Sequence, residues 1–547
     1  MDQLPLKRNL QIIQWNARSL SNKLSGLQDI LLRSMPHIVA IQETFLKPSS
    51  KTPNFSPFNA VRADRLVGER GGLLLLVHNT VNYLPKTLTP YPNGKLEIQA
   101  ITIQSDNQDI DIVNLYNPDN SPSAHEFQHY IDQFSDRFIF LGDFNGHHPL
   151  WEPAKNPTPN TCGRALEHLI ADNANLCLAT PDNLPTHTDD HTGETSTIDL
   201  VFCSRHYLTQ FNVLTLADQG SDHTPLLNTV EIKLDTQILG KRPKWRFTEE
   251  NWGLWLRDLD TRPAVTADSP SQEAILFTEA LVNAGEAHFK KTSDKVNTKR
   301  NKWWWNAHCA RATALRRRAK NRMRRRPTRE NILTYRRLHA AAIRVHKVAR
   351  RTAWRAYVNK ITSTASSKEI WNMIRRVKGF GTIPRSPIYN GNHLTFNIQE
   401  KAEVLVLHYK SQMFKLIDPR SPLVNTGEID RAAVGYKNAP YNKRYHPHEI
   451  ITATNSLPTV STCGKDYLHN QFLLHLNYNT KSQLLGIINR IWDTVDIPEI
   501  WKTGLLIPIL KPGKDPKQPS SYRPITLLSC LCKLMERMVY NRLAHHT

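Results

Sequence analysis

Short apolar runs alternate with polar turns through the first 232 residues of the chain. Runs of this length, bounded by turn-forming residues, predict strands that are buried on both faces. The expected strands are Leu10–Gln14, Ile38–Ile41, Gly72–Val77, Ile110–Leu115, Phe138–Leu141 and Ile198–Phe202. A helical pattern at Arg164–Asn175 lies among them. Strands mixed with helices predict an α/β or α+β layered domain.

Beyond residue 365 the apolar positions recur at helical spacing instead. The expected helices are Glu369–Lys378, Ile398–Met413, His448–Ser456 and Leu484–Thr494. No apolar run in the sequence is long enough to span a bilayer, and the N-terminal residues lack the apolar core of a signal peptide. We therefore expect an intracellular protein.

A strongly basic stretch separates these two regions. Lys299–Lys360 holds 21 lysine and arginine residues against one acidic residue, Glu330, so nearly all of the formal net charge of +22 lies there. Aromatic residues are interleaved with the basic ones, and this mixture suits phosphates and stacked bases. The alternatives are a solvated helical face or a nuclear-import signal at Arg322–Arg326. The arginines that we single out as nucleic-acid contacts are Arg317, Arg325, Arg337 and Arg344.

Length and cysteine content narrow the class of protein. A chain of 547 residues is too long for one hydrophobic core, so several domains are expected. The seven cysteines are scattered and form no CxxC pair. This spacing indicates neither a zinc knuckle nor a disulfide framework, and it favours a reduced protein.

Each buried run of the first region ends at or near a polar side chain. A polar residue at the end of a single strand is ordinary in a turn. Polar residues at the ends of several strands indicate a site built from strand ends and loops. Carboxylate and amide oxygens without cysteine ligands suit a hard cation such as Mg²⁺, and the set fits metal-assisted hydrolysis of a phosphodiester. The residues at these ends are Asn16, Glu43, Tyr116, Asp143, Asn145, Asp199, Asp222 and His223.

Six separated motifs carry a family resemblance. They are WNAR (15–18), QET (42–44), LYNP (115–118), GDFN (142–145), STIDL (196–200) and SDH (221–223). In this order they resemble the endonuclease/exonuclease/phosphatase family. The continuation GDFNGHHPLW (142–151) is similar to the apurinic-type endonuclease of insect non-LTR retrotransposons, the Jockey-like LINE elements. The resemblance implies a four-layered α/β sandwich of two mixed sheets flanked by helices, with the site at one edge.

The resemblance also implies a metal site. Glu43 would be the principal Mg²⁺ ligand, helped by Asn16 and Asp222, and Mn²⁺ could substitute for Mg²⁺. Repair enzymes of this family usually carry an acidic residue just after the first motif's asparagine. Here Ala17 and Arg18 follow instead, which argues against abasic-site repair and makes Arg18 a candidate DNA contact.

The remaining roles that the resemblance implies concern the water and the phosphate. Asp143 would position and deprotonate the attacking water, and Asn145 would hold the water or the phosphate. His223, paired with Asp199, would bind the scissile phosphate and stabilise its charge, and Tyr116 would contact the same phosphate.

Two neighbouring histidines follow the GDFN motif. His147 and His148 have no third soft ligand at suitable spacing, so we do not expect a zinc site. His147 is instead expected to shape the loop that faces DNA, or to cap it.

The C-terminal region has a second resemblance. KEIWNMIRRVKG (368–379) and LKPGKDPKQPSSYRPITLLSCLCKLMERMVYNRL (510–543) resemble the segment that leads into and opens a non-LTR reverse transcriptase. This resemblance implies nucleic-acid contacts at Lys511, Lys514 and Arg523. The alternative is that they are exposed basic residues of a Pro-rich loop.

Polymerases of this class need paired aspartates in a Tyr-x-Asp-Asp turn. The sole Asp-Asp pair of this sequence, Asp189–Asp190, lies in the first region, and the chain ends at Thr547 shortly after the fingers begin. We therefore expect an incomplete set of reverse-transcriptase fingers and no polymerisation by this chain.

These observations predict three parts: an endonuclease at 1–232, a mainly helical basic linker at 233–364 and a pre-polymerase region at 365–547. The expected activity is Mg²⁺-dependent nicking of target DNA to leave a 3′-OH primer for reverse transcription of the element RNA. The expected partners are therefore target DNA and element RNA, with action in the nucleus and no membrane. The rival hypotheses are an apurinic-type repair endonuclease and an inactive relic that binds nucleic acid.

Overall fold

The computed structural model describes most of the chain between residues 9 and 546. Outside the description lie residues 233, 235–241, 263–264, 293–303, 360–386 and 414–441, and a few isolated positions at 54–120 and 392–397. The helix expected at Glu369–Lys378 and the motif at 368–379 therefore lie outside the described residues.

The chain divides into two compact units. The first comprises Met1–Leu239, Asn297–Pro387 and Phe396–Ile398. The second comprises Gly240–Val296, Ile388–Thr395 and Gln399–Thr547. The functional boundaries that we expect after residues 232 and 364 stay a prediction.

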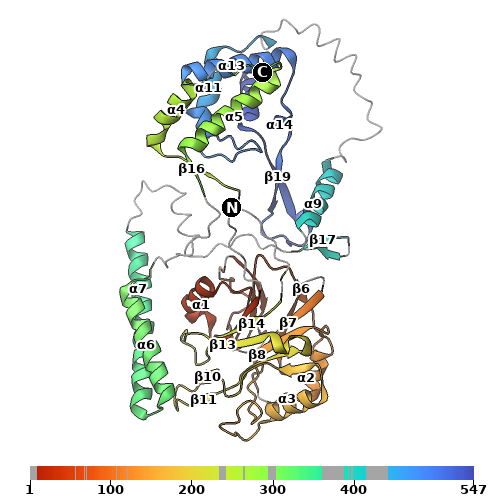
Figure 1. The fold of residues 1–547 in the computed structure, drawn as a ribbon, viewed down its shortest axis with the longest axis vertical. Coiled ribbons are helices and arrows are strands. Elements are labelled where there is room, and N and C mark those ends of the chain that lie inside the picture. The colour runs from red at the N-terminus through yellow and green to blue at the C-terminus, as the bar shows by residue number, and fades with distance from the viewer. Residues whose placement is uncertain are drawn as a thin grey trace. The chain divides into compact units, whose positions relative to one another are not determined.

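Two mixed sheets form the centre of the first unit (Figure 1). The first sheet has the spatial order β13 (Phe211–Thr215), β14 (Leu226–Val230), β1 (Leu10–Asn16), β2 (Ile38–Gln42), β4 (Leu73–His78) and β3 (Phe58–Ala63). The second has the order β5 (Tyr83–Lys86), β6 (Glu97–Ser105), β7 (Gln108–Tyr116), β8 (Phe138–Asp143), β12 (Asp199–Ser204) and β9 (Leu176–Leu178). One pair in each sheet is parallel, β1 with β2 and β7 with β8.

The apolar side chains of these strands explain the layering. One buried cluster joins the two sheets, with Ile12 and Ile38 of the first sheet packed with Ile112 and Ile139 of the second. The expected strands are buried on both faces because each sheet is also covered on its outer side.

Helices cover the outer face of each sheet. Helix α1 (Leu20–Ser34) packs on the first sheet through a cluster that includes Leu27 and Trp15. Helices α2 (Ala124–Ile131) and α3 (Thr161–Asp172) pack on the second through a cluster that includes Phe127. The result is a sandwich of two mixed sheets flanked by helices, as the family resemblance implies. A short hairpin, β10 (His187–Thr188) with β11 (Thr195–Ser196), and the 3₁₀ helix η1 (Arg205–Gln210) complete this part.

The basic stretch contributes two further helices to the first unit, α6 (Ala307–Arg325) and α7 (Arg329–Val358). Pro327 lies between them, where it cannot continue a helix, and Thr328 caps α7 by accepting a hydrogen bond from the Asn331 amide. The two helices pack on each other through Ala319, Met323 and Tyr335. The helical character expected for the basic stretch is therefore present.

The second unit has a core of its own, in which Trp255 and Phe277 pack with Phe472 and Ile488. Its helices are α4 (Trp252–Asp260), α5 (Pro270–His288), α9 (Ile398–Met413), α11 (Pro447–Asn455), α12 (Asn470–Leu474), α13 (Tyr478–Thr494), α14 (Glu499–Lys502) and α15 (Cys530–His546), with 3₁₀ helices η2 (Glu249–Asn251) and η5 (Pro519–Ser521). Its strands pair as β15 (Trp245–Arg246) with β16 (Lys290–Lys291), β17 (Ile388–Asn390) with β18 (His393–Thr395), and β19 (Leu505–Leu510) with β20 (Tyr522–Leu527).

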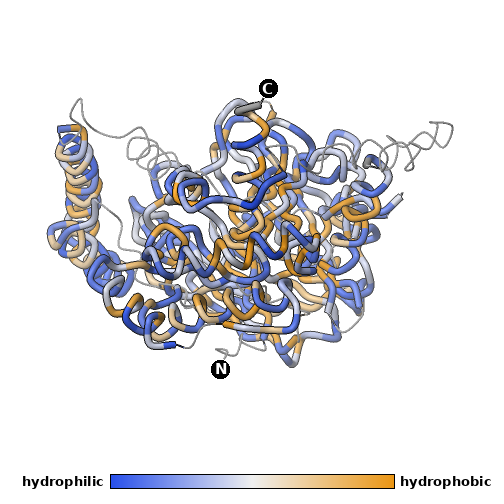
Figure 2. Tube along the Cα trace, turned by 90° about the horizontal axis from the view of Figure 1, so that it is seen from above, coloured by the Kyte–Doolittle hydropathy of each residue, from blue (hydrophilic) through white to orange (hydrophobic). Residues whose placement is uncertain are grey.

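Hydrophobic stretches of the trace are concentrated inside the packed regions, and hydrophilic ones lie mostly outside (Figure 2). Within the described ranges, we find no helix whose length and apolar character would let it cross a membrane.

Candidate active site at the strand ends of the first unit

The register of the second sheet places three candidate residues side by side. β8 runs parallel to β7 and antiparallel to β12, so Asp143 is the Cα partner of both Tyr116 and Asp199. Parallel pairing of β1 with β2 sets Asn16 beside Gln42 and therefore next to Glu43. Strand ends far apart in the sequence thus meet at one edge of the sandwich.

Asn16 connects the two sheets at this edge. Its side-chain amide donates hydrogen bonds to Glu43 Oε1, at 2.8 Å, and to Asp143 Oδ2, at 2.7 Å. Both Asn16 and Asp143 are buried, and such an amide is the kind of partner that a buried carboxylate requires. The Asn16 side-chain oxygen accepts from the Arg18 backbone amide at 3.0 Å.

His223 lies between two buried aspartates. Its Nδ1 is 2.9 Å from Asp199 Oδ2, and its Nε2 is 3.8 Å from Asp143 Oδ2. Burial lowers the pKa of His223, but the charges of Asp199 and Asp143 outweigh burial and raise it to about 10. Burial raises the pKa of Asp143 to about 7, with Asp199 adding to the rise and His223 opposing it. The cluster therefore combines an imidazolium with a carboxyl group that can take up a proton near neutrality.

Hydrogen bonds to the first sheet and within the loop hold the loop that carries His223. The Ser221 hydroxyl lies 2.9 Å from the Asn16 carbonyl oxygen, to which it donates, and 3.1 Å from Asp222 Oδ1. Trp15 Nε1 donates to the His223 carbonyl oxygen at 3.3 Å. Ser221 thus supports the turn that carries Asp222 and His223.

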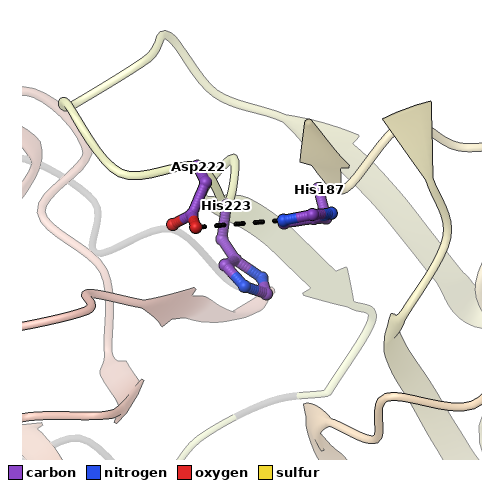
Figure 3. A group of neighbouring side chains, drawn as sticks. All are labelled: His187, Asp222 and His223. Carbon is purple, nitrogen blue, oxygen red and sulfur yellow. Dashed lines mark ion pairs between the residues drawn. The ribbon is translucent and has the colours of Figure 1, made fainter. Parts of the chain in front are cut away.

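Asp222 faces Arg18 and a second histidine, His187. Arg18 forms an ion pair with Asp222 Oδ2, and His187 Nε2 lies 3.9 Å from the same oxygen. Figure 3 shows His187 on its short strand, directed at Asp222 and next to His223. Burial opposes ionisation of Asp222, but the charges of His223 and Arg18 outweigh it, so the pKa of Asp222 lies well below its ordinary value.

Asn145 and Tyr116 flank Asp143. The Asn145 side-chain amide donates to the Asn117 carbonyl oxygen at 2.7 Å, and its backbone amide donates to Asp143 Oδ1 at 3.2 Å. Burial, with the nearby charges of Glu43 and Asp143, raises the pKa of the Tyr116 hydroxyl far above its usual range. Tyr116 is therefore a neutral hydroxyl that can donate a hydrogen bond to an anion.

Three residues of this edge have left-handed backbone conformations that non-glycine residues rarely adopt. The φ angles are 42° at Arg18, 46° at Glu43 and 50° at Asn145. Such conformations cost free energy and persist only where the surrounding structure imposes them, and they cluster at functional sites.

The donor set at this edge fits a hard divalent cation. Glu43 Oε1 and Asp143 Oδ2 both accept a hydrogen bond from the Asn16 amide, and Asp199 adds a carboxylate that is buried like that of Asp143. Burial raises the pKa of Asp143, and the charges of Asp199 and Glu43 add to the rise, so a cation bound beside these carboxylates would favour the ionised form of Asp143. Ligand atoms of Asp143, Asp199 and His223, and separately of His187, Asp222 and His223, lie within 4.8 Å of one another. Oxygen-rich sites of this kind suit Mg²⁺.

The candidate nucleic-acid contacts fall in different places. His147 Nδ1 lies 3.0 Å from Glu152 Oε2, in the loop that precedes α3, and no third ligand joins His147 and His148 among the described residues. Arg18 is half exposed beside the site. Arg317 is partly buried against the loop at 218–219. The other candidates are exposed, namely Arg325, Arg337, Arg344, Lys511, Lys514 and Arg523. Their roles stay predictions.

Sequence reasoning did not single out His187 or the α6 side chains that contact the catalytic loop. His187 lies in a polar loop without an apolar run before it, so no strand-end signal identifies it. Lys320 and Arg316 belong to a run of basic residues that reads as an exposed face, although Lys320 is only 1% exposed.

Comparisons with known proteins agree with the motifs. The sequence family described as "Endonuclease-reverse transcriptase" matches residues 110–227. The chain is 25% identical over 567 residues to the probable RNA-directed DNA polymerase from transposon X-element of Drosophila melanogaster, covering 98% of this chain and 58% of that protein. It is also 25% identical over 532 residues to the RNA-directed DNA polymerase from mobile element jockey of Drosophila funebris, covering 94% and 55%. The chain thus spans somewhat more than half the length of these relatives.

Solved structures that resemble the chain include the endonuclease domain of TRAS1, a telomere-specific non-LTR retrotransposon. It shares 17% sequence identity and covers 42% of this chain and 99% of its own, with a TM-score of 0.33. An AP endonuclease from Archaeoglobus fulgidus shares 16% identity and covers 40% and 99%, with a TM-score of 0.31. The family resemblance that the motifs predict is confirmed by the match to the sequence family and by the relatives that extend over most of the chain.

Proposed function

Because this chain is a distant homologue of RNA-directed DNA polymerases of non-LTR retrotransposons over most of its length, we propose that its endonuclease domain nicks target DNA. The reaction would be Mg²⁺-dependent hydrolysis of one strand to leave a 3′-OH end. In the retrotransposon this end would prime reverse transcription of the element RNA, and target DNA and element RNA would be the partners.

One observation carries the proposal: the buried cluster of Asp143, His223 and Asp199 is joined through Asn16 to Glu43. This arrangement combines a proton acceptor, a fixed positive charge and a carboxylate at the edge of a cation site. Those are the groups that hydrolysis of a phosphodiester by water requires.

Each residue has a role that its surroundings support. Asp143 orients the attacking water and accepts its proton, because its buried carboxylate lies at the strand end, held by the Asn16 amide at 2.7 Å and 3.8 Å from His223 Nε2. His223, held by Asp199, donates from Nε2 to the phosphate and stabilises the charge that develops there. Asn145 holds the water or a phosphate oxygen, and Tyr116 donates to the same phosphate.

The metal would be held by Glu43 with Asn16 and Asp222, as the resemblance implies. When bound, Mg²⁺ or Mn²⁺ would neutralise charge on the phosphate oxygens. The contact of Asn16 with Glu43 supports the pairing of these two ligands, whereas Asp222 forms an ion pair with Arg18 that metal binding would have to replace.

The test is nicking of supercoiled plasmid by the full chain with Mg²⁺ or with a chelator. We expect Mg²⁺-dependent nicking that Asp143→Ala and His223→Ala each reduce by on the order of 10³-fold or more, as loss of a general base or a transition-state contact does. Asp172→Ala and His206→Ala are matched controls, because both residues are exposed and lie outside the site.

Two further readouts separate the alternatives. A product with a 3′-OH can be extended by an added polymerase without phosphatase treatment, as priming requires. Cleavage of an abasic-site duplex while intact plasmid survives would favour a repair endonuclease instead. Absence of any cleavage would favour an inactive relic that binds nucleic acid.

A further inference from the structure

The helical pair α6–α7 is fastened to the loop that carries the candidate catalytic residues. Lys320 Nζ lies 3.3 Å from Asp218 Oδ1 and also donates to the Ser221 carbonyl oxygen. Arg316 Nη2 pairs with Asp218 Oδ2 at 2.9 Å. Lys320, Arg316 and Asp218 are all at most 8% exposed in their side chains, so this is an internal contact and not a transient surface pair.

Further contacts extend this attachment on both sides. Arg317 Nε donates to the Asp218 carbonyl oxygen at 2.9 Å, and Arg324 Nη2 donates to the Pro185 carbonyl oxygen at 3.2 Å. Gly193 approaches the turn between the helices so closely that a Cβ there would meet Pro327 at 2.8 Å. The helices therefore form a fixed wall of the endonuclease domain instead of a freely tethered arm.

This wall encloses a cavity of about 1440 Å³ that reaches the candidate active site. Glu43 and Asp222 line the cavity on the side of the sandwich, together with residues of α1. His339 and Lys347 line it from α7. A ligand that fills the cavity would therefore extend to the candidate active site and contact the substrate bound there.

The cavity walls suit a polyanion with flat bases. Eight lysine and arginine side chains line it against four carboxylates, and the two that α7 contributes, Lys347 and Arg350, are exposed. Trp305 and His346 present rings in the same wall, with centroids 5.2 Å apart. Protein grooves that bind nucleic acids combine basic side chains, which contact the phosphate backbone of the nucleic acid, with aromatic rings, on which its bases stack.

We propose that this cavity binds the DNA that flanks the scissile phosphate, so that α6 and α7 complete the DNA-binding cleft of the endonuclease. The inference rests on the proposed nicking activity and deepens it. DNA is favoured over element RNA because Glu43 and Asp222 line the same cavity, so its occupant is continuous with the strand to be cut.

The test uses the full chain with Lys347→Ala and Arg350→Ala combined, and the matched control combines Arg351→Ala with Arg355→Ala. All four residues are exposed on α7, both variants lose two positive charges, and the control residues do not line the cavity. The readout is binding of a labelled DNA duplex by fluorescence anisotropy at several salt concentrations, without Mg²⁺. We expect the cavity variant to raise the Kd severalfold and to reduce the slope of log K against log salt by about 2. The control variant should change both quantities little.

Plasmid nicking by the same proteins separates the two proposals. If wild-type protein nicks plasmid and the cavity variant raises the KM while kcat stays within a few-fold, the inference holds. Equal effects of the two variants on binding would overturn the inference while the nicking activity stands. Loss of RNA binding without loss of DNA binding in the cavity variant would overturn the assignment to DNA. Absence of nicking by wild-type protein would refute the proposed function, and the binding data would still decide whether the cavity holds DNA.

Discussion

His223 shows how single residues set the chemistry of this site. Burial alone would keep its imidazole neutral, yet Asp199 and Asp143 together raise its pKa to about 10. The hydrogen bond of 2.9 Å from Nδ1 to Asp199 also directs Nε2 toward Asp143. Asp199 therefore supplies both the orientation and the charge of the histidine.

Replacement of Asp199 by asparagine tests its effect on the charge of His223, because asparagine has nearly the same shape as aspartate but no negative charge. We expect Asp199→Asn to lower the kcat of plasmid nicking by on the order of 10²–10³-fold, with little change in KM, because a stabilised cation at the phosphate is lost. The pKa of His223 falls in this variant, since burial is then opposed by fewer charges. Residual activity should therefore decline as the pH rises through neutrality, where the wild-type histidine stays protonated.

The pH–rate profile of Asp199→Asn, compared with Asp172→Asn as an exposed control, measures this effect. A residual activity with the same pH dependence as the wild type would show that Asp199 does not set the charge of His223.

At the scale of elements, α6 is the unexpected component of the endonuclease. Its sequence is so rich in arginine that it reads as an exposed helix, yet Arg316, Lys320 and Met323 are buried. Asp218 makes this possible, because it takes both cations and lies in the loop that leads to His223. The packing of α6 is thus coupled to the position of the catalytic loop.

Removal of Asp218 should release α6 from that loop. We expect Asp218→Ala to reduce the free energy of unfolding of the first unit by about 3–5 kcal/mol, because it removes the ion-pair partner of two buried cations. Asp29→Ala is the matched control: it removes a partly exposed partner of Arg317, at 3.7 Å, and should cost less than about 1 kcal/mol.

Denaturant unfolding, followed for both variants, measures the difference. Equal small losses in the two variants would mean that the buried ion cluster does not hold α6 in place. A loss confined to Asp218→Ala would establish the anchor.

At the scale of the whole molecule, two separate cores divide the chain. The sandwich of the first unit is built around clusters between and outside its sheets, whereas Trp255, Phe277 and Phe472 centre the second unit. The second unit combines helices from 252–288 with helices beyond residue 447, so the stretch expected as a single linker contributes to both units.

Separate cores predict separate thermal unfolding. We expect two transitions in calorimetry of the full chain, because residues in different cores lack the shared contacts that make unfolding a single step. A DNA duplex should raise the Tm of the transition that Asp218→Ala lowers, since binding to the native state stabilises the unit that binds.

A single transition, with equal calorimetric and van't Hoff enthalpies, would contradict the division. A shift by DNA of only the transition that Asp218→Ala leaves unchanged would place the binding site in the second unit.

The sequence by itself determined several of the strands and helices and the list of polar residues at their ends. Strand and helix patterns depend on neighbouring positions, so β8 at Phe138–Asp143 and α9 at Ile398–Met413 were readable from their apolar periodicity. The motifs added the order of the candidate residues, because each motif is a local string. These signals require no knowledge of which residues meet.

Only the tertiary structure decided which of these residues meet and what surrounds them. Asn16 reaches Asp143 across 127 positions of the chain, and Lys320 reaches Ser221 across 99. Such contacts follow from sheet register and packing, which no local pattern encodes. For the same reason His187 and the buried cations of α6 were not predicted: a polar side chain looks exposed in sequence, and only a distant buried partner makes its burial favourable.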